Sequence, residues 1–148
     1  MDRAGRRGGD LAIMNGLALL AVEDQPANVA LLRALLARSP QPALRDAVLD
    51  VAGTLADGHA ALERRRYDVV LLDIRLPDGD GLDIARAHAS RPDRPRFLVL
   101  TANALPGDEE GALAAGADMF MAKPYEPSAL AANILRLAGL DGDAPLRA

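Results

Sequence analysis

Short apolar runs alternate along the chain with longer segments in which apolar residues recur at helical spacing. Runs rich in Val, Leu and Ile predict strands that are buried on both faces of a sheet. The predicted strands cover residues 17–22, 48–54, 67–73, 97–102 and 118–123. The helically spaced segments predict helices at residues 26–38, 57–66, 82–89, 106–116 and 127–137.

Five strands that alternate with five helices predict an α/β fold, a doubly wound five-stranded parallel sheet with helices on both faces. Segments rich in Pro, Gly and Asp separate the elements. Residues 39–47 and 76–81 are predicted to be loops. The chain shows no internal repeat and no second domain, so we expect one domain over residues 17–138.

Residues 1–16 are basic and Gly-rich, and we expect a disordered tail there, with a short second tail at residues 139–148. The apolar stretch at 11–22 resembles a secretory signal, but Asn15 and Gly16 interrupt it and it continues into acidic residues. Either Met1 or Met14 could be the biological start. No stretch reaches the roughly 20 apolar residues of a membrane span. We therefore expect a cytoplasmic protein without a membrane partner.

Composition narrows the chemistry. Half of the 148 residues are hydrophobic but only 3% are aromatic, so the core must consist of Leu, Val, Ile and Ala. A net charge of −4 gives no indication of direct nucleic-acid binding. The absence of cysteine excludes disulfides, thiolate metal sites and a Cys nucleophile. The two histidines, His59 and His88, fall on predicted helices and are expected at the surface.

Polar residues close the predicted strands. Glu23 and Asp24 end the first, Asp73 the third, Thr101 the fourth and Lys123 the fifth. In a parallel sheet these ends share one edge, where such folds bind ligands. Three nearby carboxylates repel one another, and a hard cation such as Mg²⁺ relieves that repulsion. With an ammonium and a hydroxyl, the set suits phosphoryl transfer to an Asp nucleophile.

Four motifs carry a family resemblance: VED at 22–24, LLDIRLPDGDG at 71–81, LTA at 100–102 and KP at 123–124. In this order and spacing the chain resembles the receiver domain of two-component response regulators, over residues 17–137. Residues 23–28 and 100–124 are similar to receivers attached to hybrid histidine kinases. The resemblance implies a (βα)5 flavodoxin-like fold with strand order 2-1-3-4-5.

The resemblance also implies roles at the acidic edge. Asp73 would be the phosphoacceptor, and Asp24 would bind Mg²⁺ directly while Glu23 holds it through water. Arg75 would give its backbone carbonyl to the metal. Lys123 would pair with the acidic cluster and then with the phosphoryl group.

Thr101 would turn to bond the phosphoryl group, and Phe120 occupies the position of the aromatic switch residue. Their movement would alter a protein-interaction face formed by residues 106–116, 118–123 and 127–137. The side chains of Arg75 and Asn103 stand at the two positions that tune phosphoryl lifetime in the family.

The implied phosphoryl donor is a histidine kinase or a His phosphotransfer protein, while the downstream partner is not indicated and a homodimer remains open. Such a domain assists its own phosphorylation and is not a turnover enzyme. Two alternatives stay open. One is a receiver-like scaffold that works without phosphorylation. The other is an Asp-nucleophile phosphatase, which would need a second Asp at the position of Arg75.

Overall fold

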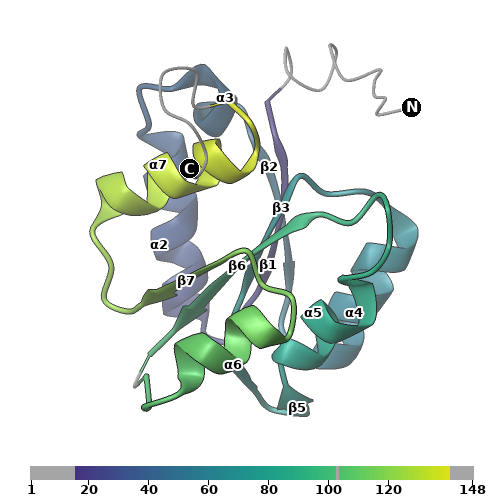
Figure 1. Cartoon of the computed structure of the whole chain (residues 1–148). Helices are drawn as coiled ribbons and strands as arrows, with labels where there is room; N and C mark the ends of the chain where they lie inside the picture. Colours follow the sequence, from purple (N-terminus) through teal and green to yellow (C-terminus); the bar gives the residue numbers. More distant parts are fainter. Residues whose placement is uncertain (1–15, 103, 141–148) are drawn as a thin grey trace.

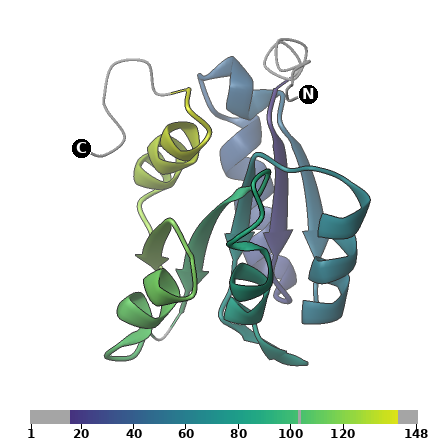
Figure 2. The ribbon, with the colours of Figure 1, turned by 45° about the vertical axis from the view of Figure 1, so that its right-hand side comes forward.

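A parallel sheet lies at the centre of the fold. The computed structural model describes residues 16–102 and 104–140. The sheet consists of β1 (Ala18–Val22), β2 (Val48–Ala52), β3 (Val69–Leu72), β6 (Arg96–Thr101) and β7 (Met119–Ala122), in the order β2-β1-β3-β6-β7. Every neighbouring pair is parallel, and the arrowheads point the same way in Figure 2. The predicted doubly wound sheet and its 2-1-3-4-5 order are confirmed.

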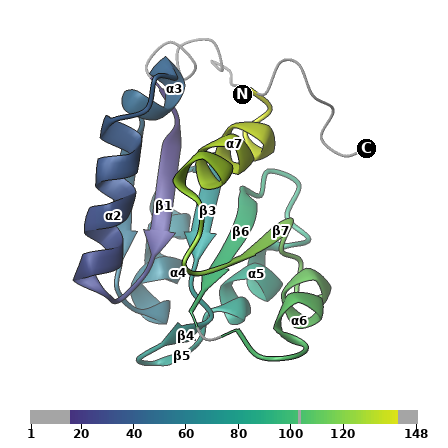
Figure 3. The ribbon, with the colours of Figure 1, turned by 90° about the vertical axis from the view of Figure 1, so that its left-hand side faces the viewer.

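Helices cover both faces of this sheet (Figures 1 and 3). One face carries α2 (Pro26–Ala37), α3 (Pro42–Arg45) and α7 (Pro127–Leu137); the other carries α4 (Leu55–Arg64), α5 (Leu82–His88) and α6 (Asp108–Ala114). Successive strand residues point to opposite faces. In β3, Leu71 packs into the core under α2 and α7, and Val70 and Leu72 pack into the core on the other side. Burial on both faces is why the inner strands β1, β3 and β6 are continuous apolar runs, whereas the edge strands β2 and β7 are partly exposed.

Two segments that were predicted to be loops contain short elements. Residues 42–45 form α3, which buries Leu44 completely beneath α2 and α7. Within residues 75–80, β4 (Arg75–Leu76) pairs antiparallel with β5 (Gly79–Asp80). Asp78, in the turn between them, accepts hydrogen bonds from the backbone N–H groups of Leu55 and Ala56 at 2.7 and 3.1 Å. The hairpin is thereby attached to the first turn of α4.

Gly81 lets the chain return to the end of β3 after this hairpin. Its N–H donates to the carbonyl of Ile74 at 2.6 Å. A Cβ at position 81 would overlap the carbonyl oxygen of Asp73, so a side chain cannot be accommodated without moving the backbone of the site.

None of the helices in the two described stretches has the length and apolar character needed to cross a bilayer. The predicted tails, residues 1–15 and 141–148, lie outside the described residues. The domain boundaries and the cytoplasmic location therefore stay predictions.

His88 is buried, which corrects the expectation that both histidines lie at the surface. Only 3% of it is exposed, and its ring stacks on that of half-buried His59 with centroids 5.8 Å apart. Burial lowers the pKa of His88 below its ordinary 6.5, the positive charges of Arg91 and His59 lower it further, and Glu63 opposes them.

The stability of the folded state should therefore fall in mild acid. Because the folded state favours the neutral His88 imidazole, the unfolded chain binds more protons between that lowered pKa and 6.5. We expect the free energy of unfolding to be highest above pH 6.5 and to fall as pH falls through this window. Urea denaturation at several pH values checks this. His88→Gln should flatten the dependence, whereas the control His59→Gln should keep most of it. An equal slope in His88→Gln and the wild type would contradict the assignment.

Candidate functional site

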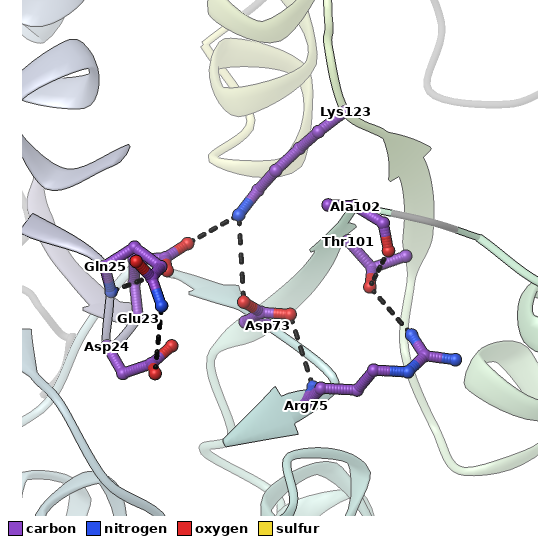
Figure 4. A network of polar contacts seen from close by, with 8 residues as sticks. All are labelled: Glu23, Asp24, Gln25, Asp73, Arg75, Thr101, Ala102 and Lys123. Atoms are coloured by element: carbon purple, nitrogen blue, oxygen red, sulfur yellow. Dashed lines mark hydrogen bonds and ion pairs between the residues drawn. The ribbon is translucent and has the colours of Figure 1, made fainter. Parts of the chain in front are cut away.

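The polar residues that close the strands meet at one edge of the sheet (Figure 4). Glu23 and Asp24 follow β1, and Asp73 follows β3, its neighbour in the sheet. One oxygen from each of these three carboxylates lies within 4.8 Å of the others. The N–H of Asp73 donates to the carbonyl of Val22 at 3.0 Å, which extends the ladder between the two strands. Parallel pairing thus forces the acidic groups together.

Lys123 follows β7, the edge strand of the sheet, and its side chain extends to this cluster. Its Nζ donates to Glu23 Oε1 at 2.6 Å and lies 3.7 Å from Asp73 Oδ2. The side chains of Lys123, Glu23 and Asp73 are only 10%, 6% and 12% exposed. The N–H of Lys123 donates to the carbonyl of Thr101 at 2.8 Å, and the following peptide bond, to Pro124, is cis. One largely buried ammonium therefore holds two of the three carboxylates.

Further hydrogen bonds orient the acids. The N–H of Gln25 donates to Glu23 Oε2 at 3.0 Å, and the Gln25 side chain donates to Asp24 Oδ2 at 3.4 Å. Glu23 therefore uses one oxygen for Lys123 and the other for the backbone. Asp24 is half-buried and has no closer protein donor among the described residues, so its carboxylate is available to a ligand.

The charge balance of the site leaves room for another cation. Burial raises the pKa of Asp73, with a further rise from the charges of Glu23 and Asp24; Lys123 and the N–H of Arg75 oppose it. Three carboxylates face a single ammonium. Oxygen donors with excess negative charge are the ligands that Mg²⁺ prefers. Glu23, Asp24 and Asp73 thus fit a magnesium site by their chemistry.

The remaining predicted residues lie around this cluster at different depths. Thr101 ends β6, is 1% exposed, donates to the carbonyl of Ala102 at 3.2 Å and accepts from Arg75 Nη1 at 3.1 Å. The N–H of Arg75 donates to Asp73 Oδ1 at 3.3 Å. Phe120, in β7, is half-buried against the core under α4, α5 and α6. Asn103 lies outside the described residues.

Asp108 was not recognised as part of this region from the sequence. Its Oδ2 accepts from Arg75 Nη2 at 3.2 Å and from the N–H of Leu105 at 2.7 Å. In the sequence, the acids at 108–110 indicate only a helix start. A partner 33 residues away, on another element, leaves no spacing signal.

A groove beside the acidic cluster was also not foreseen. It has a volume of about 760 Å³ and runs between α2, α7 and the β7–α7 loop, with Lys123 in its wall. Leu31 lines it and is 61% exposed. The available signal was that Leu31 lies beside the apolar stripe of the first predicted helix, where a polar residue is expected.

Residues 19–135 match the family described as the response regulator receiver domain. The chain belongs to this family. It is therefore a receiver domain of two-component signalling.

This receiver domain is similar to segments of larger sensor proteins. It is 44% identical over 124 residues to the aerobic respiration control sensor protein ArcB of Escherichia coli K12, and the match covers 80% of this chain and 15% of ArcB. It is 35% identical over 126 residues to the signal transduction histidine-protein kinase BarA of the same strain, covering 81% of this chain and 13% of BarA. The chain thus spans a small part of these relatives.

A solved structure of a receiver domain has the same fold. The receiver domain of the sensor histidine kinase PA1611 from Pseudomonas aeruginosa PAO1 superposes with a TM-score of 0.72 at 32% identity, covering 84% of this chain and 98% of that one. That structure has a magnesium ion coordinated in its active-site cleft.

Neutralising Asp73 should stabilise the receiver domain when divalent cations are absent. Asp73→Asn removes one of three mutually repelling charges without changing the size of the side chain, and Lys123 keeps Glu23 as its partner. We expect the free energy of unfolding to rise by about 1 kcal/mol, the order of one screened charge pair at this distance.

Chemical denaturation in EDTA measures this. The control is Asp93→Asn, which loses an exposed ion pair with Arg66 and should change stability little. A loss of stability in Asp73→Asn, relative to that control, would show that the cluster is not repulsive.

Proposed function

We propose that this receiver domain accepts a phosphoryl group on Asp73 from a phosphohistidine, and that the transfer depends on Mg²⁺. The observation that carries the proposal is the grouping of Glu23, Asp24 and Asp73 within 4.8 Å, with Lys123 bonded to the cluster. The similarity to segments of a control sensor protein and of a signal transduction histidine-protein kinase supports a phosphorelay.

In the proposed step, a carboxylate oxygen of Asp73 attacks phosphorus and the phosphorus–nitrogen bond of phosphohistidine breaks. The electron pair of that bond stays on the imidazole nitrogen, which takes up a proton, and Asp73 becomes an acyl phosphate. Lys123, 3.7 Å from Asp73 Oδ2, pairs with a phosphoryl oxygen. Asp24, Asp73 and the Arg75 carbonyl would hold Mg²⁺, with Glu23 acting through water, and the ion would supply positive charge against the phosphoryl oxygens.

Phosphorylation then acts as a switch rather than as one turn of an enzyme cycle. Thr101 turns its hydroxyl toward the phosphoryl group and Phe120 moves inward, which changes the face made by α6, β7 and α7. Thr101 pairs with Ala122 and Val99 with Phe120 in the β6–β7 ladder, so the two switch residues lie on neighbouring strands. Arg75 stands where an Asp-nucleophile phosphatase needs a second acid, which argues against turnover.

Incubation with acetyl phosphate and Mg²⁺ should add the mass of one phosphoryl group to the intact protein. The adduct should be absent in Asp73→Asn and in EDTA, because the nucleophile or the compensating charge is missing. Intact-protein mass spectrometry measures it. No adduct with several phosphoryl donors would favour a scaffold that works without phosphorylation, and sustained hydrolysis of a phosphate ester would favour a phosphatase.

The groove between α2 and α7 is the surface that we propose a histidine kinase or His phosphotransfer protein covers. The donor's histidine must reach Asp73, and the groove opens beside Lys123, which contacts Asp73. Its wall contains exposed Leu31, and an apolar side chain at a protein surface is a suitable contact for a partner helix.

Leu31→Asp should separate docking from chemistry. With the donor found by profiling phosphotransfer from candidate kinases, we expect transfer to slow tenfold or more, on the order of the loss of one apolar hot spot. The rate with acetyl phosphate should stay unchanged because the acidic cluster is intact. Leu113→Asp, the same substitution at another exposed leucine, on α6, is the control. Equal slowing by both donors would indicate damage to the site instead.

Arg75 is proposed to lengthen the life of the phosphoryl group. Its side chain runs from beside Asp73 toward Thr101 (Figure 4), so it is within reach of an acyl phosphate on Asp73 and can shield that group from water. Asn103, the second position proposed to tune this lifetime, stays a prediction. Arg75→Ala should shorten the half-life severalfold in a phosphoryl-decay assay, whereas Arg86→Ala, an exposed arginine on α5, should not. Unchanged decay in Arg75→Ala would refute the shielding role.

A further inference from the structure

One guanidinium group joins three segments around the proposed phosphorylation site. Arg75, in β4, donates through Nη1 to Thr101 Oγ1 at 3.1 Å and through Nη2 to Asp108 Oδ2 at 3.2 Å. Thr101 ends β6 and Asp108 begins α6. We call this arrangement of Arg75, Thr101 and Asp108 the Arg75 bridge.

Asp108 anchors the bridge firmly on the α6 side. The same Oδ2 that binds Arg75 also accepts the N–H of Leu105 at 2.7 Å, so the carboxylate fixes the turn that leads into α6. The bond from Leu105 lowers the pKa of Asp108, and Arg75 lowers it further, so the carboxylate stays charged at neutral pH.

The Thr101 hydroxyl is fully committed in this arrangement. Its proton goes to the carbonyl of Ala102 at 3.2 Å, and its oxygen accepts from Arg75. A hydroxyl has one proton, so Thr101 cannot donate to a group on Asp73 until it leaves Ala102. The Arg75 bridge therefore belongs to the resting form of the domain.

A phosphoryl group on Asp73 would compete for the guanidinium of Arg75. Arg75 starts two residues after Asp73, and its N–H already contacts Asp73 Oδ1 at 3.3 Å. A phosphoryl group brings about −1.5 to −2 charge, against a single charge on Asp108. The Arg75 side chain is 45% exposed, so changing partner requires no burial or exposure of a new charge.

We propose that the Arg75–Asp108 ion pair holds the domain in its resting form, and that Asp108 is a positioning residue which opposes phosphorylation by retaining Arg75. The proposal rests on the proposed phosphorylation of Asp73. When Arg75 moves to the phosphoryl group, Thr101 and the first turn of α6 are released together. The bridge thus couples the state of Asp73 to the start of the helix that belongs to the proposed output face.

The test is an Asp108→Asn variant of the full chain, titrated with beryllofluoride as the phosphoryl analogue at saturating Mg²⁺ and followed by the amide NMR signals of Thr101 and Leu105. Asn keeps an oxygen for the Leu105 N–H but loses the charge that retains Arg75. We expect beryllofluoride to bind about two- to fivefold more tightly, the range of a partly exposed ion pair. The affinity for Mg²⁺ alone should not change.

Glu109→Gln is the matched control. It removes one negative charge from the same first turn of α6, but the Glu109 side chain makes no hydrogen bond or ion pair to any other described residue, so the affinity of this variant should equal that of the wild type. Arg75→Gln provides a second test of whether Asp108 acts through Arg75. In an Arg75→Gln background, Asp108→Asn should have no further effect because the ion pair is already lost.

Three results would overturn the proposal. Equal beryllofluoride affinity in Asp108→Asn and the wild type would show that the pair does not oppose activation. An undiminished effect of Asp108→Asn in the Arg75→Gln background would show that Asp108 acts without Arg75. Absence of beryllofluoride binding in every variant would instead remove the proposed phosphorylation on which the bridge depends.

Discussion

The ion pair between Lys123 and Glu23, 2.6 Å long and almost fully buried, is the contact on which the site depends. The carboxyl ends of parallel strands lie at one edge of the sheet, so the acids that follow the neighbouring strands β1 and β3 lie close together. Lys123 begins beyond β7, and β6 separates that strand from β3. A long, flexible side chain is needed to cross this distance and bring positive charge between Glu23 and Asp73. The fold thereby creates a repulsion and partly relieves it from a distant strand.

The layered core could be predicted because its inner strands are buried on both faces. Apolar runs such as 69–72 contain few polar residues, and the segments between them follow a helical period, so the alternation of elements was visible. Alternation alone does not give the order of strands in the sheet. That order came from the resemblance to receiver domains, and the structure confirms it. The acidic edge could be predicted from the strand pattern itself, because polar residues end the predicted strands and the ends of parallel strands share one edge.

The features that escaped prediction depend on contacts between distant segments. α3 is too short to show a period, and it forms where Leu44 enters a core that other elements build. The β4–β5 hairpin is attached through Asp78 to α4, 22 and 23 residues earlier in the chain. His88 lies on a helix of seven residues, too few to reveal which face is inward. Asp108 acquires its partner only because the Arg75 side chain reaches from β4 to the start of α6.

The two cationic side chains of the site differ in a way that suits different tasks. Lys123 is 10% exposed and is held by two carboxylates, so displacing it would leave buried charge without a partner. Arg75 is 45% exposed, so it can exchange the Thr101 hydroxyl and the Asp108 carboxylate for a different anion at small cost. Lys123 is therefore suited to constant placement of charge, and Arg75 to a response that depends on what Asp73 carries.

The surroundings of Asp73 are also divided in space. The groove that we assign to the phosphoryl donor is lined by α2, α7 and the residues after β6 and β7, and no α6 residue contributes to it. In Figure 4 Lys123, which lines the groove, and the Arg75 side chain, which leads to α6, lie on opposite sides of Asp73. The sheet edge thus allows one residue to be reached by a donor from one side while its state is transmitted to α6 on the other.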